Sequence, residues 1–218
     1  MVLISPPPPT VSPRPLYETV RPETPLIRIF NRSSRYKTQA NTYRFFGPLL
    51  RFDHQPPLNK LQAAKMNGLE DPSRGITYWG YSLSCCLVEL FGDTKIVEFK
   101  EYEVAISIIK QPLLLLDIRG KGAMAAGSVL ALSSVGDRHV SQAWSRYFYE
   151  QTDIYSKVDG ILYSNAHNGE AALALYERSE PIISNAKMQT RPLKDKSIRH
   201  LIDAAVAENN MNCFEPYG

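Results

Sequence analysis

The placement of proline constrains this chain more than any other sequence feature. Half of its 16 prolines lie before residue 26, and residues 6–9 are four consecutive prolines. Proline fixes φ and lacks a backbone N–H donor, so such a segment can form neither a helix nor a central strand. We therefore predict an extended, polyproline-type N-terminal arm over residues 1–24, loosely attached to the rest. Binding to a proline-reading partner is the alternative use of such an arm.

From residue 25 onward the sequence carries alternating strand and helix signals. Short apolar or alternating segments predict strands over 26–30, 76–81, 95–109, 113–118, 159–163 and 171–176. Helical periodicity predicts helices over 82–91, 123–132, 137–151 and 196–208. Residues 53–75 predict a long loop with one helical turn around 60–66. Helices inserted between strands that need not be parallel indicate the α+β class, with mixed or antiparallel sheets.

The composition argues against a metal site, an exported protein and a membrane protein. Three cysteines and four histidines show no metal-ligand spacing, and a sparse, odd cysteine set favours a reducing compartment. The apolar stretch at residues 1–5 is too short for a signal peptide, and the apolar run at 113–116 is too short to cross a bilayer. We expect a cytoplasmic protein without membrane contact and without a bound metal ion.

One stretch has a composition suited to nucleotides. Between Glu23 and Asp53 there is no acidic residue, while five arginines and a lysine are interleaved with six aromatic residues. Guanidinium groups match phosphate oxygens, and aromatic faces stack on bases. The stretch therefore suits a nucleotide, a dinucleotide or a single-stranded nucleic acid. A solvated strand face and loop, with arginines paired to acids elsewhere, is the alternative that composition alone favours.

Two single residues are also candidates for chemistry. Glu89 is the only charge in an apolar predicted helix, and Ser164 ends the predicted strand over 159–163. Taken alone, a solvent-facing glutamate and a serine of a strand-end turn are the ordinary interpretations. The order and spacing of these residues along the chain carry more information than either residue alone.

That order resembles the RES domain family. The motifs, in sequence, are Arg51-Phe-Asp53, Gly75-Ile-Thr-Tyr78, Val88-Glu89-Leu-Phe and Asp159-Gly-Ile-Leu-Tyr-Ser164. Tyr78 and Glu89 lie eleven positions apart, as the strand-then-helix module of the family requires, and Arg28 matches the arginine of its first strand. The resemblance covers residues 25–185. Two departures stand out: Asp53 replaces the usual asparagine, and the stretch from Arg51 to Tyr78 is longer than usual.

The resemblance implies an ADP-ribosyltransferase-like fold and an enzyme that cleaves the nicotinamide–ribose bond of NAD, as a glycohydrolase or phosphorylase. Family members are toxins paired with a helical antitoxin. By position, Arg28 and Arg51 would hold pyrophosphate or ribose oxygens, and Tyr78 would pack against the nicotinamide ribose. Glu89 would bind ribose hydroxyls and stabilise positive charge. Ser164 would contact the nicotinamide amide or the adjacent phosphate. Glu89, Arg51 and Ser164 are thus the predicted catalytic residues.

Two further functions stay open. Some members of the family modify proteins, so a mono-ADP-ribosyltransferase is the second hypothesis. The third is a non-catalytic nucleic-acid-binding module, which predicts binding that falls steeply with salt and no need for Glu89. As partners we expect NAD, an antitoxin of helical, DNA-binding type, and association with a second copy of the chain. We expect residues 186–218 to form a helical extension packed on the domain.

Overall fold

A computed structural model describes residues 3–34, 38–57 and 69–214. Within these residues a single large sheet has the strand order β1-β8-β9-β10-β5-β2-β7-β11. Its strands are β1 (Tyr17–Val20), β2 (Pro25–Asn31), β5 (Ile76–Gly80), β7 (Tyr102–Ile108), β8 (Leu113–Asp117), β9 (Gly160–Ser164), β10 (Ala171–Tyr176) and β11 (Lys187–Pro192). Two small sheets pair β3 (Phe46–Gly47) with β4 (Leu69–Glu70), and β6 (Ile96–Glu98) with β12 (Asn212–Phe214).

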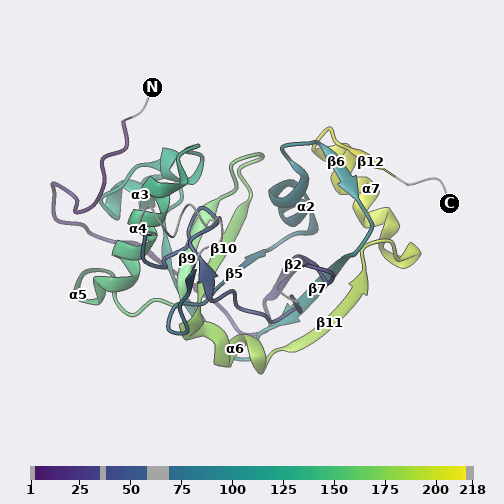
Figure 1. The fold of residues 1–218 in the computed structure, drawn as a ribbon, viewed down its shortest axis with the longest axis horizontal. Coiled ribbons are helices and arrows are strands. Elements are labelled where there is room, and N and C mark those ends of the chain that lie inside the picture. The colour runs from purple at the N-terminus through teal and green to yellow at the C-terminus, as the bar shows by residue number, and fades with distance from the viewer. Residues whose placement is uncertain (1–2, 35–37, 58–68, 215–218) are drawn as a thin grey trace.

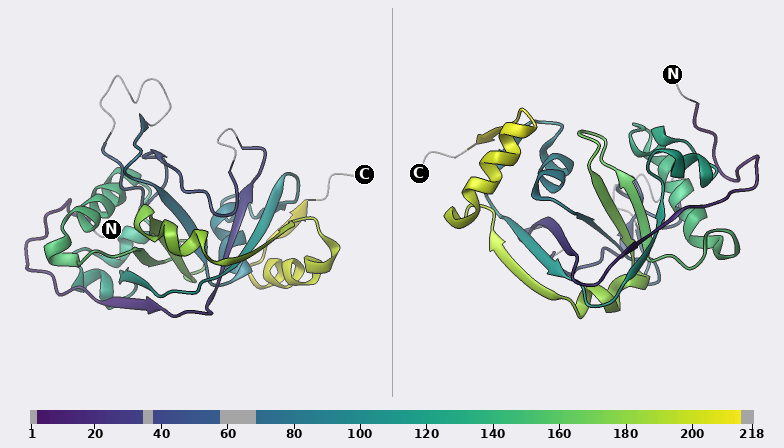
Figure 2. Two further views of the ribbon diagram at one scale, coloured as in Figure 1. Left: turned by 90° about the horizontal axis from the view of Figure 1, so that it is seen from below. Right: turned by 180° about the vertical axis from the view of Figure 1, so that it is seen from behind.

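The helices gather at the ends of the sheet and inside its curl (Figure 1). They are α2 (Leu83–Phe91), α3 (Lys121–Ala125), α4 (Arg138–Glu150), α5 (Thr152–Tyr155), α6 (Glu180–Ser184) and α7 (Arg199–Glu208), with short 3₁₀ helices at Leu130–Ser133, Glu177–Ser179 and Lys196–Ile198. Helices α3, α4 and α5 lie at one end of the molecule, and α7 lies at the other beside β6 and β12 (Figure 2). No helix in the described part of the chain is both long and apolar enough to traverse a bilayer.

The large sheet is nearly split in two. Only β8 and β9 pair in parallel; the other neighbours are antiparallel. Strands β2 and β5 share a single register pair, Ile27 with Gly80, whereas β2 and β7 pair over seven residues. Because β2 and β5 meet only at this point, the two halves of the sheet diverge, and α2 lies inside the curl between them (Figure 1). This divergence is what leaves room for a site.

Apolar packing on both faces holds this arrangement. The buried side chains of β8 alternate between two core clusters, with Leu115 on one side and Leu116 on the other. This is the behaviour predicted for a continuous apolar strand. On α2, Leu87 and Val88 pack against Ile202 of α7. The α+β class and most of the predicted elements are therefore confirmed.

Some predicted elements are wrong. The helix predicted over 123–132 is interrupted: α3 ends at Ala125, Gly127 has φ +81°, and a 3₁₀ helix follows. The strand over 95–109 is divided into β6 and β7, with Glu101 at φ +66° between them. The segment after residue 185, expected to be helical, begins with β11. The helical turn predicted around 60–66 lies outside the described residues.

The N-terminal arm is not loosely attached. Its last residues form β1, which pairs with β8 at an edge of the sheet, the position that proline-rich flanks allow. Earlier in the arm, the Arg14 amide donates to the carbonyl of Ala125 at 2.8 Å. The Trp144 indole donates to the carbonyl of Ser5 at 2.9 Å. These two hydrogen bonds hold the arm against α3 and α4.

Candidate functional site

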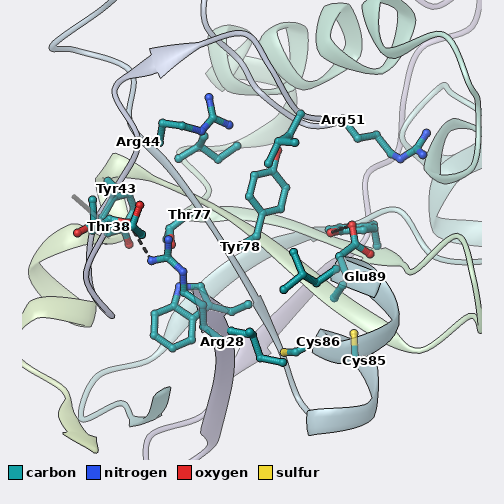
Figure 3. Close-up of a pocket in the computed structure, with 18 of the residues that line it drawn as sticks. Arg28, Thr38, Tyr43, Arg44, Arg51, Thr77, Tyr78, Cys85, Cys86 and Glu89 are labelled. Atoms are coloured by element: carbon teal, nitrogen blue, oxygen red, sulfur yellow. Dashed lines mark hydrogen bonds between the residues drawn. The ribbon is translucent and has the colours of Figure 1, made fainter. Parts of the chain in front are cut away.

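A cavity of about 860 Å³ opens where the two halves of the sheet diverge. Its walls come from β2, β5 and α2, from the segment over residues 38–51, and from the start of α4. Ligand pockets commonly have volumes of roughly 300–1,000 Å³, so a dinucleotide is within range. The cavity brings together four predicted site residues, Arg28, Arg51, Tyr78 and Glu89 (Figure 3).

Helix α2, which carries Glu89, is anchored at its N-terminus. Ser82 caps the helix by accepting a hydrogen bond from the Cys85 amide at 2.8 Å, and its hydroxyl donates to Glu170. The side-chain amide of Asn165 donates to the Cys85 carbonyl at 3.2 Å. These contacts tie the first turn of α2 to the β9–β10 connection. Glu89, in the last turn, is therefore held in a defined position.

Glu89 lines the cavity, and its side chain is exposed there. The cavity leaves its carboxylate accessible, but protein surrounds it, and the Tyr163 hydroxyl donates to its Oε1 at 3.4 Å. Burial raises the pKa of Glu89 above its ordinary value, and the nearby guanidinium of Arg51 opposes this shift. A carboxylate with a perturbed pKa inside a cleft is a typical functional residue.

A buried carboxylate, Asp53, organises the opposite wall. It is fully buried, and Arg44 donates to both of its oxygens at 2.7 and 2.8 Å. The backbone amides of Leu49 and Leu50 donate to Oδ2. Asp53 thus closes the turn that carries Arg51. Arg44 supplies the charge that compensates the buried carboxylate.

Tyr78 belongs to the same hydrogen-bond network. Its hydroxyl donates to Asp53 Oδ1 at 2.9 Å and accepts from the Phe52 amide at 3.2 Å. Burial, and next the negative charge of Asp53, raise the pKa of Tyr78 well above its ordinary value. Since the hydroxyl is already engaged on both sides, Tyr78 offers the cavity its ring and not its proton. This agrees with a packing role.

Arg51 extends into the cavity on the same side of Tyr78 as Glu89 (Figure 3). One of its guanidinium nitrogens donates to the carbonyl of Val135, just before α4. Helix α4 holds the adjoining turn: Arg138 donates to the Leu49 carbonyl at 3.1 Å, and Gln142 to the Leu50 carbonyl at 3.0 Å. The position of Arg51 therefore depends on α4 and the segment before it.

Arg28 lies at the other end of the cavity (Figure 3). It donates to the carbonyls of Ala40 at 3.0 Å and Thr42 at 2.8 Å, and its guanidinium carbon lies 5.9 Å from the centre of the Trp79 ring. Burial lowers the pKa of Arg28 to about 10. Among the described residues, its hydrogen-bond acceptors are carbonyls and not carboxylates. The charge is therefore hydrogen-bonded but not neutralised, a state that an anion in the cavity would relieve.

The structure does not bring Ser164 into the cavity with the other predicted residues. Its neighbour Tyr163 lines the cavity instead, and Ser164 pairs with Ala171 on β10. Successive side chains of a strand point to opposite faces, and on β9 the Tyr163 side chain is the one that lies at the cavity. The predicted contact between Ser164 and the substrate stays a prediction. Nothing in the sequence indicated that Tyr163 lines the cavity, because an aromatic residue within an apolar strand predicts only a core position.

The described part of the chain holds no cluster of three His, Cys, Asp or Glu side chains placed to bind a metal ion. The cavity is lined by three carboxylates, Glu70, Glu89 and Asp93, together with several guanidinium groups, His167 and aromatic rings. Such a set can bind a polyanion and stabilise a developing positive charge next to it.

Comparisons with known proteins agree with the sequence motifs. The model of the RES domain family matches residues 25–196. "Probable toxin y4kH" of Sinorhizobium fredii is 34% identical over 86 residues, which span 39% of this chain and 65% of that protein. A chain in the crystal structure of the M. tuberculosis MbcT–MbcA toxin–antitoxin complex superposes with a TM-score of 0.52 at 14% identity, over 86% of this chain and 92% of that chain. This structural likeness confirms the predicted ADP-ribosyltransferase-like fold.

Proposed function

Since the chain belongs to the RES domain family, we propose that it cleaves the nicotinamide–ribose bond of NAD and acts as a toxin that a cognate antitoxin neutralises. The observation that carries the proposal is Glu89, a carboxylate with a raised pKa inside a cavity of about 860 Å³. The names of the similar proteins, a probable toxin and a toxin–antitoxin complex, support the biological role.

The reaction needs few protein groups. When the bond between C1′ of the ribose and the pyridinium nitrogen breaks, its electron pair stays on nitrogen, and nicotinamide leaves as a neutral molecule. No general acid is required, in contrast to ordinary glycosidases, which use two carboxylates. The sugar is left with an oxocarbenium-like cation. A fixed carboxylate at the position of Glu89 stabilises that charge in the transition state.

The other cavity residues have matching roles. Arg51, on the same side of Tyr78 as Glu89, would bind the pyrophosphate or ribose oxygens near the reacting bond. Arg28 carries a buried charge without a carboxylate among its described hydrogen-bond partners, and would bind phosphate at the far end. The ring of Tyr78 lies between them and would pack against the nicotinamide ribose.

The nucleic-acid alternative receives little support from the same stretch of arginines. Arg28 and Arg51 bind carbonyls inside the cavity, and Arg44 pairs with buried Asp53. Arg32, on the surface, pairs with Glu103 at 2.8 Å. In the described part of the stretch these arginines do not form a row of free guanidinium groups along one surface, as binding to a nucleic-acid backbone requires.

The test is release of nicotinamide from NAD by the purified protein and by two variants. Glu89→Gln should reduce the rate on the order of a hundredfold or more, because it removes the charge but keeps the shape. Glu208→Gln, on an exposed position of α7, is the matched control and should be unaffected. Products with and without added phosphate, and the mass of the protein itself, identify water, phosphate or protein as the acceptor of the ribosyl group.

The toxin role has its own test. Expression of the wild-type chain in bacteria should deplete NAD and arrest growth, and Glu89→Gln should relieve both effects. Normal growth and a normal NAD pool, with confirmed soluble wild-type protein, would refute the toxin role even if the purified enzyme degraded NAD slowly.

A further inference from the structure

The N-terminal arm makes specific contacts outside the residues that the family model matches. Ser5 accepts a hydrogen bond from Trp144, and Arg14 donates one to Ala125. In addition, Ile4 packs against the core cluster that contains Trp144. Gly127 has φ +81°, and a Cβ at this position would lie 2.6 Å from Pro9 Cβ. Only glycine permits this approach of the arm to the chain. In Figures 1 and 2 the arm runs past α3 and α4 at this end of the molecule.

The segment that receives these contacts is anchored to the core at Ala126 and Leu132, and the Tyr155 hydroxyl donates to the Ala126 carbonyl at 3.0 Å, but its other backbone hydrogen bonds are mostly local. Between α3 and α4, the amides of Gly127, Ser128, Leu132 and Ser134 donate to carbonyls at most five residues away. No strand of the large sheet includes residues 126–137. Where most backbone hydrogen bonds are local, packing against other parts of the chain decides how ordered a segment is. The arm supplies part of that packing.

The same segment forms one wall of the cavity. Val129 faces the arm across a small cavity that both line, and the 3₁₀ helix Leu130–Ser133 follows it directly. Ser134 then lines the large cavity, and the carbonyl of Val135 accepts the hydrogen bond from Arg51. Val129, which faces the arm, and Val135, which accepts the hydrogen bond from Arg51, are thus only six residues apart along the chain.

We propose that the N-terminal arm stabilises the conformation of residues 126–138 and thereby positions Arg51 for the substrate. This role rests on the proposed NAD chemistry, but it lies outside the part of the chain that the family model matches. The arm residues do not touch the substrate. They act through the backbone carbonyl of Val135.

The arm offers its own matched control, because one of its faces packs on the domain and the other faces solvent. The test variant is Ile4→Asp with Pro9→Ser, which disturbs only the packed face. The control is Thr19→Asp with Pro22→Ser, at exposed positions of the arm that do not line the small cavity. All substitutions lie in the arm of the full chain, so the segment over 126–138 keeps its own sequence.

Two measurements are needed: amide hydrogen exchange, and kcat and KM for NAD. In the test variant we expect faster exchange confined to residues 126–138 and a KM raised about tenfold, with a smaller change in kcat, since Arg51 would act mainly in binding. The control should match the wild type. Unchanged exchange, or faster exchange with unchanged KM, would overturn the proposal, as would faster exchange spread over the whole chain. If the wild type degrades no NAD, the proposed function fails. In that case, faster amide exchange confined to residues 126–138 of the test variant would still support the role of the arm, and unchanged exchange would still refute it.

Discussion

Replacing Asp53 by asparagine removes one charge at a fully buried position while nearly preserving the shape of the side chain. The carboxylate accepts hydrogen bonds from Arg44, from the Tyr78 hydroxyl and from the amides of Leu49 and Leu50. All of these groups are donors. An asparagine presents only one acceptor atom, so in either orientation its NH₂ group faces donors that lose their partner.

The cost can be estimated from this geometry. Arg44 has a side chain that is only 17% exposed, so it would keep a largely buried charge without its partner. Removing one partner of a buried ion pair typically costs about 3–5 kcal/mol. For a chain of this size each kcal/mol lowers Tm by about 2–4 °C, so Asp53→Asn should lower it by roughly 6–20 °C. The turn that carries Arg51 should lose its geometry as well.

Thermal unfolding of four variants tests the estimate: Asp53→Asn, Arg44→Met, the two combined, and Asp71→Asn. Asp71→Asn is the control, because Asp71 is partly exposed, accepts hydrogen bonds from Ser73 and pairs with Arg74 only at 3.9 Å, so the loss of its charge should matter far less. Arg44→Met combined with Asp53→Asn should recover part of the stability, since no unpaired charge remains. A Tm for Asp53→Asn as high as that of the Asp71 variant would refute the reasoning, and so would strictly additive effects in the double variant.

Two other predictions concern the cavity. Burial raises the pKa of Glu89, so the folded state favours the protonated side chain. The stability that protonated Glu89 contributes is lost as the pH rises from the unfolded-state pKa through the higher folded-state pKa. At neutral pH, Glu89→Gln should therefore keep or raise Tm. The acid limb of the pH–rate profile should lie at a higher pH than the pKa of an ordinary glutamate. It should move higher still in Arg51→Met, because the charge of Arg51 lowers the pKa of Glu89. An acid limb at the ordinary value would contradict the assignment of this limb to Glu89. Arg28→Met should lower both Tm and NAD turnover, because the carbonyls of Ala40 and Thr42 lose their donor. Arg51→Met should lower turnover with a smaller change in Tm. Equal losses of Tm in the two variants would argue against this division of roles.

Several site residues could be predicted because their signals are local. The apolar run at β8 and the helical spacing around Glu89 depend on neighbours along the chain, and the structure places both as expected. The motif order likewise led to Arg51, Tyr78 and Glu89, which the cavity brings together. Ser164 shows the limit of motif reading, because a shift of one residue along a strand changes the face to which a side chain points.

Other features were decided by contacts between distant parts of the chain. β11 is polar and largely exposed, with no alternation to reveal it, and only its pairing with β7 makes it a strand. The pairing of Asp53 with Arg44 and Tyr78, and the docking of the arm through Gly127, likewise depend on tertiary approach. The sequence by itself determined the α+β class, the family and the helix that carries the glutamate, because local periodicity and motif order suffice for these. Tertiary structure decided which charges are neutralised and which face the cavity, because burial and partner choice arise only when segments far apart in sequence meet.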